Sequence, residues 1–459
     1  MLAAGCPTRD ISKLDPSPAI EYEQKINVNV NRQIDILFVI DNSDSMKEEQ
    51  DSLAANFPRF IDVLSTIAGG LPDVHIAVVS SDVGIPPYTA EACSENGDDG
   101  LMQNTAHPPT GGTCSPPRNG ARYIEDVAGA PGQPRIKNYD GDLDDVFGCI
   151  ARLGNSGCGV EQHLESMRRA LDGRHPENGG FLRPDAYLAV IILADEDDCS
   201  ARDTNVFNPA TQFDTLNSMY GPFSSFRCAE FGITCDNMTL ARAAADYTTC
   251  MPRGDSYLYH PDEYVGFLRQ LKGNPNLVVT SIISGNPTPV GTELTMTDPN
   301  RPAPRLKPSC ISTNGRADPG VRLKYFGDQQ GSQNLWTSIC QADLTDSLKR
   351  IAELLGIVLG TRCLRGPVDT ADIDAAEPGV QLDCNVADVR FRGTPTQEET
   401  TIPRFPMTGP TSPDTSSVPC WWAEASTVAC ENFAELHVER GAANPPIGTE
   451  IVIKCVAVQ

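Results

Sequence analysis

Four mostly apolar runs stand out along the first two thirds of the chain, and each ends at a polar residue. They cover residues 36–40, 74–79, 186–194 and 277–283. The first and third runs contain almost no polar side chain, so both faces of the corresponding strand are apolar and should be buried from solvent. Such runs are typical of strands buried on both faces of a parallel sheet.

Between and after these runs, apolar residues recur at helical spacing. The stretches at 53–64, 160–171 and 344–355 each place leucine, isoleucine, phenylalanine or methionine on one stripe. Each stripe is wide enough to cover one face of a sheet. Strands that alternate with helices predict βαβ crossovers, and therefore an α/β protein with a parallel sheet.

Three oxygen-bearing side chains follow the first run within five residues. Asp41 ends the run, and Ser43 and Ser45 come at alternating positions before the expected helix. The carboxyl end of a strand in an open α/β sheet is where ligands bind. A carboxylate and two hydroxyls are hard donors, which suit Mg²⁺ best, with Ca²⁺ and Mn²⁺ as alternatives.

The sequence Asp41-x-Ser43-x-Ser45 after a buried strand resembles the metal-ion-dependent adhesion site (MIDAS) of von Willebrand factor type A (VWA) domains. The resemblance implies a doubly wound, mostly parallel, Rossmann-like sheet. It also implies a metal that recruits an acidic side chain from a protein partner in cell adhesion. Asp195 ends the third run as Asp41 ends the first, and the resemblance gives it the role of a second carboxylate that binds through water.

The third contribution to the metal differs from the family. VWA domains usually offer a threonine from a glycine-rich loop, but residues 154–163 contain none. Ser156 offers a neutral hydroxyl and Glu161 offers a carboxylate. A neutral ligand leaves the ion attractive to an acidic partner, whereas a third carboxylate weakens that attraction and favours Ca²⁺. We favour Glu161 because we expect Cys158 to pin this loop.

Composition limits the function and the compartment. The chain has 459 residues and a formal net charge of −25, which argues against nucleic-acid binding. It has 16 cysteines but no C-x-x-C pair, and its histidines form no zinc motif. Disulfides in an oxidising, extracytoplasmic compartment explain so many cysteines. Proximity along the sequence suggests the pairs Cys93–Cys114, Cys149–Cys158 and Cys420–Cys430.

The first residues resemble the lipobox of bacterial lipoproteins. Small residues precede Cys6 in the segment Leu2-Ala-Ala-Gly-Cys6. In that class the cysteine is acylated, so Cys6 would anchor the chain to a membrane of the bacterial cell envelope. Residues 1–32 would then form a lipobox and tether.

Three long insertions interrupt the region that we assign to a VWA domain, residues 33–363. They lie near 83–148, 196–260 and 286–340, and each begins where a predicted strand ends. Parallel strands end at the same edge, so we expect the insertions to form a disulfide-braced rim around Asp41. Alternating apolar and polar residues from 364 to 459 predict a small antiparallel β-domain with disulfides.

The leading hypothesis is a membrane-anchored, metal-dependent protein-binding module and not an enzyme. A metal-dependent hydrolase is the second hypothesis. Phosphatases of the haloacid-dehalogenase type also carry an aspartate at a strand end, but they need a second aspartate where Ser43 stands, and no other catalytic motif is evident. The third hypothesis is a structural envelope lipoprotein with a degenerate metal site.

Overall fold

The computed structural model describes residues 20–27, 32–67, 70–90, 92–130, 132–253, 257–296, 302–312, 315–359, 363–364, 368–369, 382–391, 396–405, 407–409, 412–413, 418–425, 434–440 and 449–457. The chain divides into two compact units. One unit spans Asn31–Leu359, and the other combines Met1–Val30 with Gly360–Gln459. The two units are described separately below.

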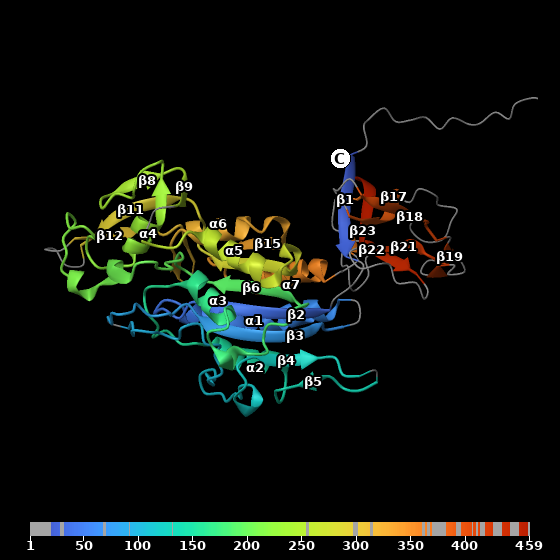
Figure 1. The fold of residues 1–459 in the computed structure, drawn as a ribbon, viewed down its shortest axis with the longest axis horizontal. Helices are drawn as coiled ribbons and strands as arrows, with labels where there is room; N and C mark the ends of the chain where they lie inside the picture. Colours follow the sequence, from blue (N-terminus) through green and yellow to red (C-terminus); the bar gives the residue numbers. More distant parts are fainter. Residues whose placement is uncertain are drawn as a thin grey trace, which may run out of the picture. The chain divides into compact units, whose positions relative to one another are not determined.

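A seven-stranded sheet forms the centre of the larger unit (Figure 1). Its strands in spatial order are β15 (Asn334–Ser338), β10 (Val278–Ser284), β6 (Tyr187–Leu193), β2 (Gln33–Ile40), β3 (Asp73–Ser80), β4 (Ile124–Val127) and β5 (Ile136–Lys137). The first five strands pair in parallel, and β4 and β5 add to the edge in antiparallel pairs.

Helices bury both faces of this sheet, which explains the unbroken apolar runs. In β2, Ile36, Phe38 and Ile40 face the core shared with α1 (Lys47–Ser65), α2 (Leu143–Ala151) and α7 (Thr345–Val358). Leu37 and Val39 face the opposite core, shared with α3 (His163–Leu171), α5 (Pro261–Lys272) and α6 (Val321–Asp328). An apolar residue at every position is the consequence of two covered faces.

The insertions contain short elements of their own. They include α4 (Phe226–Gly232), β7 (Ile233–Cys235), β8 (Ala245–Tyr247), β9 (Cys250–Pro252), β11 (Val290–Thr295), β12 (Ala303–Leu306), β13 (Cys310–Ile311), β14 (Arg316–Ala317) and 3-10 turns at Arg118–Gly120, Thr204–Phe207, Pro209–Thr211 and Gly331–Gln333. Two further 3-10 turns, Pro176–Asn178 and Pro275–Leu277, lie outside the insertions. Figure 1 shows β8, β9, β11 and β12 gathered together at one end of the unit.

The second unit consists of antiparallel strands. They are β1 (Ile20–Asn27), β16 (Cys363–Leu364), β17 (Cys384–Arg390), β18 (Glu398–Ile402), β19 (Met407–Gly409), β20 (Ser412–Pro413), β21 (Cys420–Ala425), β22 (Ala434–Glu439) and β23 (Glu450–Ala457). β1 pairs with β23 along all eight of its residues, from Ile20 opposite Ala457 to Asn27 opposite Glu450. The segment predicted to be a tether therefore includes a strand, whereas Cys6 lies outside the described residues.

The predicted fold class is wrong for the chain as a whole. The described residues form a mixed α/β structure with seven sheets, and parallel pairing is confined to five strands of one of them. The other six sheets are antiparallel. The first insertion also closes one edge of the central sheet with the antiparallel strands β4 and β5. The prediction failed because the long insertions form antiparallel pairs of short strands, which apolar runs do not reveal.

Six disulfides join described cysteines, namely Cys93–Cys158, Cys114–Cys149, Cys199–Cys228, Cys235–Cys250, Cys310–Cys340 and Cys384–Cys455. The predicted pairs Cys93–Cys114 and Cys149–Cys158 are therefore wrong, and Cys430 of the third predicted pair lies outside the described residues. Six disulfides are typical of proteins that fold in an extracytoplasmic, oxidising compartment.

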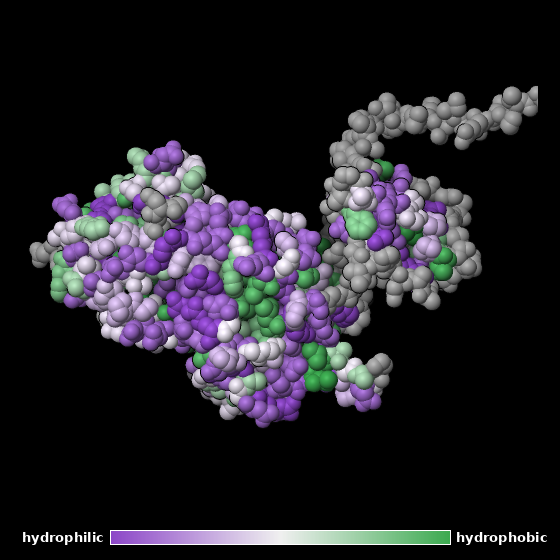
Figure 2. Space-filling view, viewed as in Figure 1, coloured by the Kyte–Doolittle hydropathy of each residue, from purple (hydrophilic) through white to green (hydrophobic). Residues whose placement is uncertain are grey.

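The face drawn in Figure 2 is mostly hydrophilic, with a group of hydrophobic residues near the middle of the larger unit. Among the helices of the described part of the chain, none combines the length and the apolar character that a membrane span requires.

Candidate acidic site at the end of strand β2

Asp41 is fully buried directly after β2. Its backbone N–H donates to the carbonyl of Leu193 at 3.0 Å, which ties it to the end of the neighbouring strand β6. Its Oδ1 atom accepts a hydrogen bond from the N–H of Ser43 at 2.8 Å. Its Oδ2 atom has no hydrogen-bond partner among the described residues. A buried carboxylate oxygen without a donor is costly unless a cation or a proton supplies the missing interaction.

The two serines lie together above this carboxylate. The Oγ atoms of Ser43 and Ser45 are 3.4 Å apart. Ser43 is buried and Ser45 is exposed, so the pair runs from the interior to the surface. The loop ends where α1 begins at Lys47.

Two further carboxyl groups are buried beside Asp41. Asp195 follows β6 and Glu161 precedes α3, and their exposed fractions are 5% and 1%. The Oδ1 atom of Asp195 and both carboxyl oxygens of Glu161 have no hydrogen-bond partner within the described part of the chain. The site therefore contains three carboxyl groups with unpaired oxygens.

The pKa values of these carboxyls reflect burial and mutual repulsion. Burial, followed by the charge of Asp41, raises the pKa of Asp195 well above its usual value. Burial, followed by the charges of Glu196 and Asp41, does the same to the pKa of Glu161. Burial is also the main cause that raises the pKa values of Glu49 and Glu196, each to about 7.

The glycine-rich loop 154–163 is fastened to the Asp41 loop by several contacts. The side chain of Gln50 donates to the carbonyls of Asp41 and Gly154 at 2.8 and 2.9 Å. The N–H of Gly157 donates to the carbonyl of Asn42 at 2.9 Å. A Cβ atom at Gly157 would lie 2.2 Å from Oδ1 of Asn42, so only glycine permits this approach.

The structure separates the two alternatives for the third contribution. Ser43, Ser45 and Glu161 line one pocket of about 420 Å³, together with Glu196. Ser156 is exposed and does not line that pocket. The structure therefore brings Glu161, rather than Ser156, to the predicted site.

Three neighbours of the site were not predicted from the sequence. Nε2 of the buried His163 is 3.5 Å from Oδ2 of Asp41. Glu49 is buried in the first turn of α1, and its Oε2 atom has no hydrogen-bond partner among the residues that the structure describes. Glu196 follows Asp195 directly. Each of these residues lies within a few positions of a predicted ligand or loop along the sequence, and this nearness was the one signal that could have indicated them.

The donor set fits a cation only if the serines take part. Across the described residues, no three His, Cys, Asp or Glu side chains are clustered closely enough to hold a metal ion. Two hydroxyls and the unpaired carboxylate oxygens are the available donors. Hard oxygen donors of this kind suit Mg²⁺, Mn²⁺ or Ca²⁺ rather than a soft metal.

Parts of the insertions border this site, as the rim hypothesis requires. Phe207 and Phe223 of the second insertion line the same pocket. In the third insertion, the N–H of Asp318 donates to the carbonyl of Asp195 at 2.8 Å. The first insertion reaches the site through Cys93, which is bonded to Cys158. However, part of the first insertion forms β4 and β5 at the edge of the sheet instead.

Comparison with known proteins adds little. No protein-family model matches the chain, and no curated protein matches it. A solved structure of the pilus adhesin RrgA from Streptococcus pneumoniae is similar at a TM-score of 0.26 and 8% identity. The similarity covers 94% of this chain and 57% of that one, so the chain spans a little over half of the adhesin's length. A similarity this weak carries no argument about function.

Proposed function

We propose that the protein is an extracytoplasmic, metal-dependent protein-binding module of the bacterial cell envelope. One observation carries the proposal. Asp41, Asp195 and Glu161 each carry a buried, unpaired oxygen, and the charge of Asp41 raises the pKa values of the other two, near the hydroxyls of Ser43 and Ser45 at the end of β2. A divalent cation would stabilise these carboxylates, and Mg²⁺ is our first choice.

The motif Asp41-x-Ser43-x-Ser45 supports the adhesive part of the proposal through its resemblance to the MIDAS of VWA domains. Ser43 and Ser45 would bind the ion directly, Asp41 directly or through water, and Asp195 through water. Glu161 would take the place of the usual threonine. The ion would supply a coordination position for an acidic side chain of a protein partner.

The location is proposed from two features. Six disulfides indicate an oxidising compartment. The lipobox-like segment that ends at Cys6 would add a lipid anchor to the envelope membrane.

Calorimetric titration with Mg²⁺ and Mn²⁺ tests the metal site. We expect saturable binding to the wild type and at least tenfold weaker binding to Asp41→Ala. Asp62→Ala is the matched control, because Asp62 is an exposed aspartate on α1 whose side chain is 68% accessible. Equal binding to the wild type and Asp41→Ala would show that the cation site is elsewhere or absent.

Capture from an envelope extract tests the adhesive role. A protein partner should be retained by the wild type in Mg²⁺, released by EDTA, and not retained by Asp41→Ala. Retention that ignores both EDTA and the substitution would contradict metal-dependent binding.

A further inference from the structure

The pocket of about 420 Å³ beside the acidic site has two sides of different chemistry, an acidic floor and an aromatic wall. Its acidic lining residues are Asp44, Glu161 and Glu196, and its aromatic ones are Phe207 and Phe223. No lysine, arginine or histidine is among the described residues that line it. The pocket is therefore lined by carboxyl groups on one side and by apolar rings on the other.

From this arrangement we propose that the pocket binds the lysine side chain of a protein partner. The ammonium group would meet the carboxyl groups of Glu161 and Glu196, and the aliphatic stem would pack against Phe207 and Phe223. The inference goes beyond the proposed metal-dependent function, because it concerns a different group of the partner. It shares Glu161 with the proposed metal site, so its test is made without metal.

Unused hydrogen-bond acceptors support this inference. Glu161 is 1% exposed, and neither of its carboxyl oxygens has a hydrogen-bond partner among the described residues. The Oγ atom of Ser224, another lining residue, is also buried without a partner in that part of the chain. An ammonium group has three N–H donors, so Glu161, Glu196 and Ser224 offer one acceptor group for each.

Charge balance favours a cation over an anion here. The two charges of a divalent ion could not balance Asp41, Asp195, Glu161 and Glu196 together, so the acidic groups would still lack a full counter-charge. His163 and Arg316 are the nearby basic residues, but His163 lies beside Asp41 and Arg316 pairs with Asp318 at 2.7 Å. An additional acid in the pocket would be repelled.

A second metal ion fits the pocket less well than an ammonium group. The described residues contain no cluster of three His, Cys, Asp or Glu side chains with the spacing that a metal needs. A metal also gains nothing from two phenyl rings. Lysine combines a compact charge with a flexible apolar stem, which suits both sides of the pocket.

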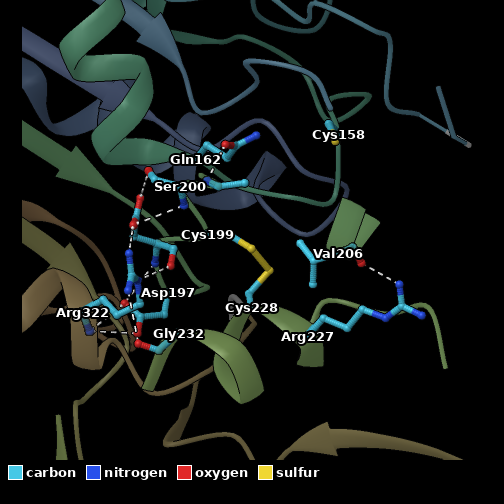
Figure 3. Close-up of a disulfide and its surroundings, with 12 residues drawn as sticks. Cys158, Gln162, Asp197, Cys199, Ser200, Val206, Arg227, Cys228, Gly232 and Arg322 are labelled. Carbon is cyan, nitrogen blue, oxygen red and sulfur yellow. Dashed lines mark hydrogen bonds and ion pairs between the residues drawn. A yellow bond between two sulfur atoms is a disulfide. The ribbon is translucent and has the colours of Figure 1, made fainter. Parts of the chain in front are cut away.

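The aromatic wall is held in place before any partner arrives. The disulfide Cys199–Cys228 joins α4 to the segment that follows Asp195, and Arg227 on α4 donates to the carbonyl of Val206 at 2.6 Å (Figure 3). Phe207 comes next in the chain and is 1% exposed. The guanidinium of Arg227 also packs 5.2 Å from the ring centre of Phe223. A wall fixed in this way loses little entropy on binding.

The segment that carries Glu196 is anchored at the same time. Asp197 accepts hydrogen bonds from the N–H groups of Arg322 and Leu323, at 2.9 and 3.0 Å. The Arg322 guanidinium pairs with Asp198 at 2.9 Å, with both side chains fully buried. Figure 3 shows Arg322 directed toward this acidic segment. The floor and the wall therefore belong to one braced unit.

Binding of two small amides to the full chain tests the proposal. The probes are N-acetyl-lysine N-methylamide and its norleucine counterpart, which has a similar stem without the ammonium. Ligand-observed NMR titration in EDTA should give saturable binding of the lysine amide and at least tenfold weaker binding of the norleucine amide. Equal binding of both amides, or no saturable lysine binding, would overturn the proposal.

Two substitutions locate the binding. Glu161→Gln and Phe223→Ala should each weaken binding of the lysine amide at least tenfold, with a cooperative thermal unfolding transition as the check that both variants fold. Phe223→Ala should bind Mg²⁺ as the wild type does, because Phe223 offers no ligand atom. Lysine binding that survives both substitutions would place the amine elsewhere and refute the inference. Failure of the metal site would appear separately, as unchanged Mg²⁺ binding in Asp41→Ala.

Discussion

The side-chain amide of Gln50 makes a closed pair of hydrogen bonds with the backbone of Gly154. Its Nε2 atom donates to the carbonyl of Gly154 at 2.9 Å, and its Oε1 atom accepts from the N–H of Gly154 at 3.0 Å. The same Nε2 atom donates to the carbonyl of Asp41 at 2.8 Å. One side chain on α1 therefore sets the distance between the Asp41 loop and the glycine-rich loop that carries Glu161.

Replacing Gln50 should loosen both loops. In Gln50→Ala, the carbonyl of Asp41 loses a donor, and the two backbone groups of Gly154 lose their partner. The bond to the Asp41 carbonyl is buried, whereas Gly154 is exposed and can bond to water instead. One buried group left unpaired costs roughly 1–3 kcal/mol, so we expect a loss of that order in the free energy of unfolding. Urea unfolding measures this loss, and calorimetry should show weaker Mg²⁺ binding.

The exposed Gln133 provides the matched control for this substitution. Gln133→Ala should leave both the stability and the Mg²⁺ affinity within error of the wild type. If Gln50→Ala were as stable as Gln133→Ala and bound Mg²⁺ equally well, the bridge would have no role in holding the site.

The buried carboxyl of Glu49 should make stability fall as pH rises. Its pKa is about 7 in the folded protein, mainly because of burial, whereas the ordinary pKa of a glutamate side chain is 4.5. Between these two values the folded state binds more protons than the unfolded state, so the free energy of unfolding decreases with pH. Above about pH 7 the protein loses the full amount of stability that burying the ionised Glu49 carboxylate costs. Below about pH 4.5 the carboxyl is protonated in both states and this loss is absent.

Glu49→Gln removes this cost while keeping the shape of the side chain. In EDTA at pH 8 we expect the free energy of unfolding of Glu49→Gln to exceed that of the wild type by up to about 3 kcal/mol, since one pKa unit corresponds to about 1.4 kcal/mol. At pH 4.5 the two should differ little. The neighbouring Glu48 is exposed, so Glu48→Gln should show no such dependence on pH. A pH-independent difference for Glu49→Gln would mean that Glu49 is not a buried acid.

The sequence located the elements at the centre of the site but not their surroundings. The runs at 36–40, 74–79, 186–194 and 277–283 correspond to β2, β3, β6 and β10, because each strand is covered on both faces. The edge strands β15 and β5, and β4 beside β5, carry polar and partly exposed residues, so they gave no apolar run. The antiparallel sheets of the insertions were missed for the same reason, whereas the alternating pattern after residue 364 did predict antiparallel strands there.

The site residues illustrate a second limit. The position of Asp41 and Asp195 follows from the strands that end before them, and the structure does bring the two together. The choice between Ser156 and Glu161 depends on how loop 154–163 folds back, which no local pattern specifies. The same fold-back brings Cys158 to Cys93 rather than to Cys149, so proximity along the sequence misled the disulfide prediction.

The disulfide Cys93–Cys158 should support the site as well as the fold. It closes a segment with a sequence separation of 65, and Cys158 lies three positions before Glu161. Chain entropy alone predicts a stabilisation of about 4 kcal/mol for a loop of this length. Replacing both cysteines by alanine should lower the free energy of unfolding by an amount of this order. It should also weaken Mg²⁺ binding, because the loop that presents Glu161 is released.

The pair Cys235–Cys250 separates these two effects. It has a sequence separation of 15 and joins β7 to β9, and neither cysteine lines the pocket. Removing it should cost about 3 kcal/mol by the same reasoning, with no change in Mg²⁺ affinity. Urea unfolding and calorimetry of both double variants make the comparison. If the two variants lost Mg²⁺ affinity equally, the effect would be a general consequence of instability, and the glycine-rich loop would have no special part in holding the cation.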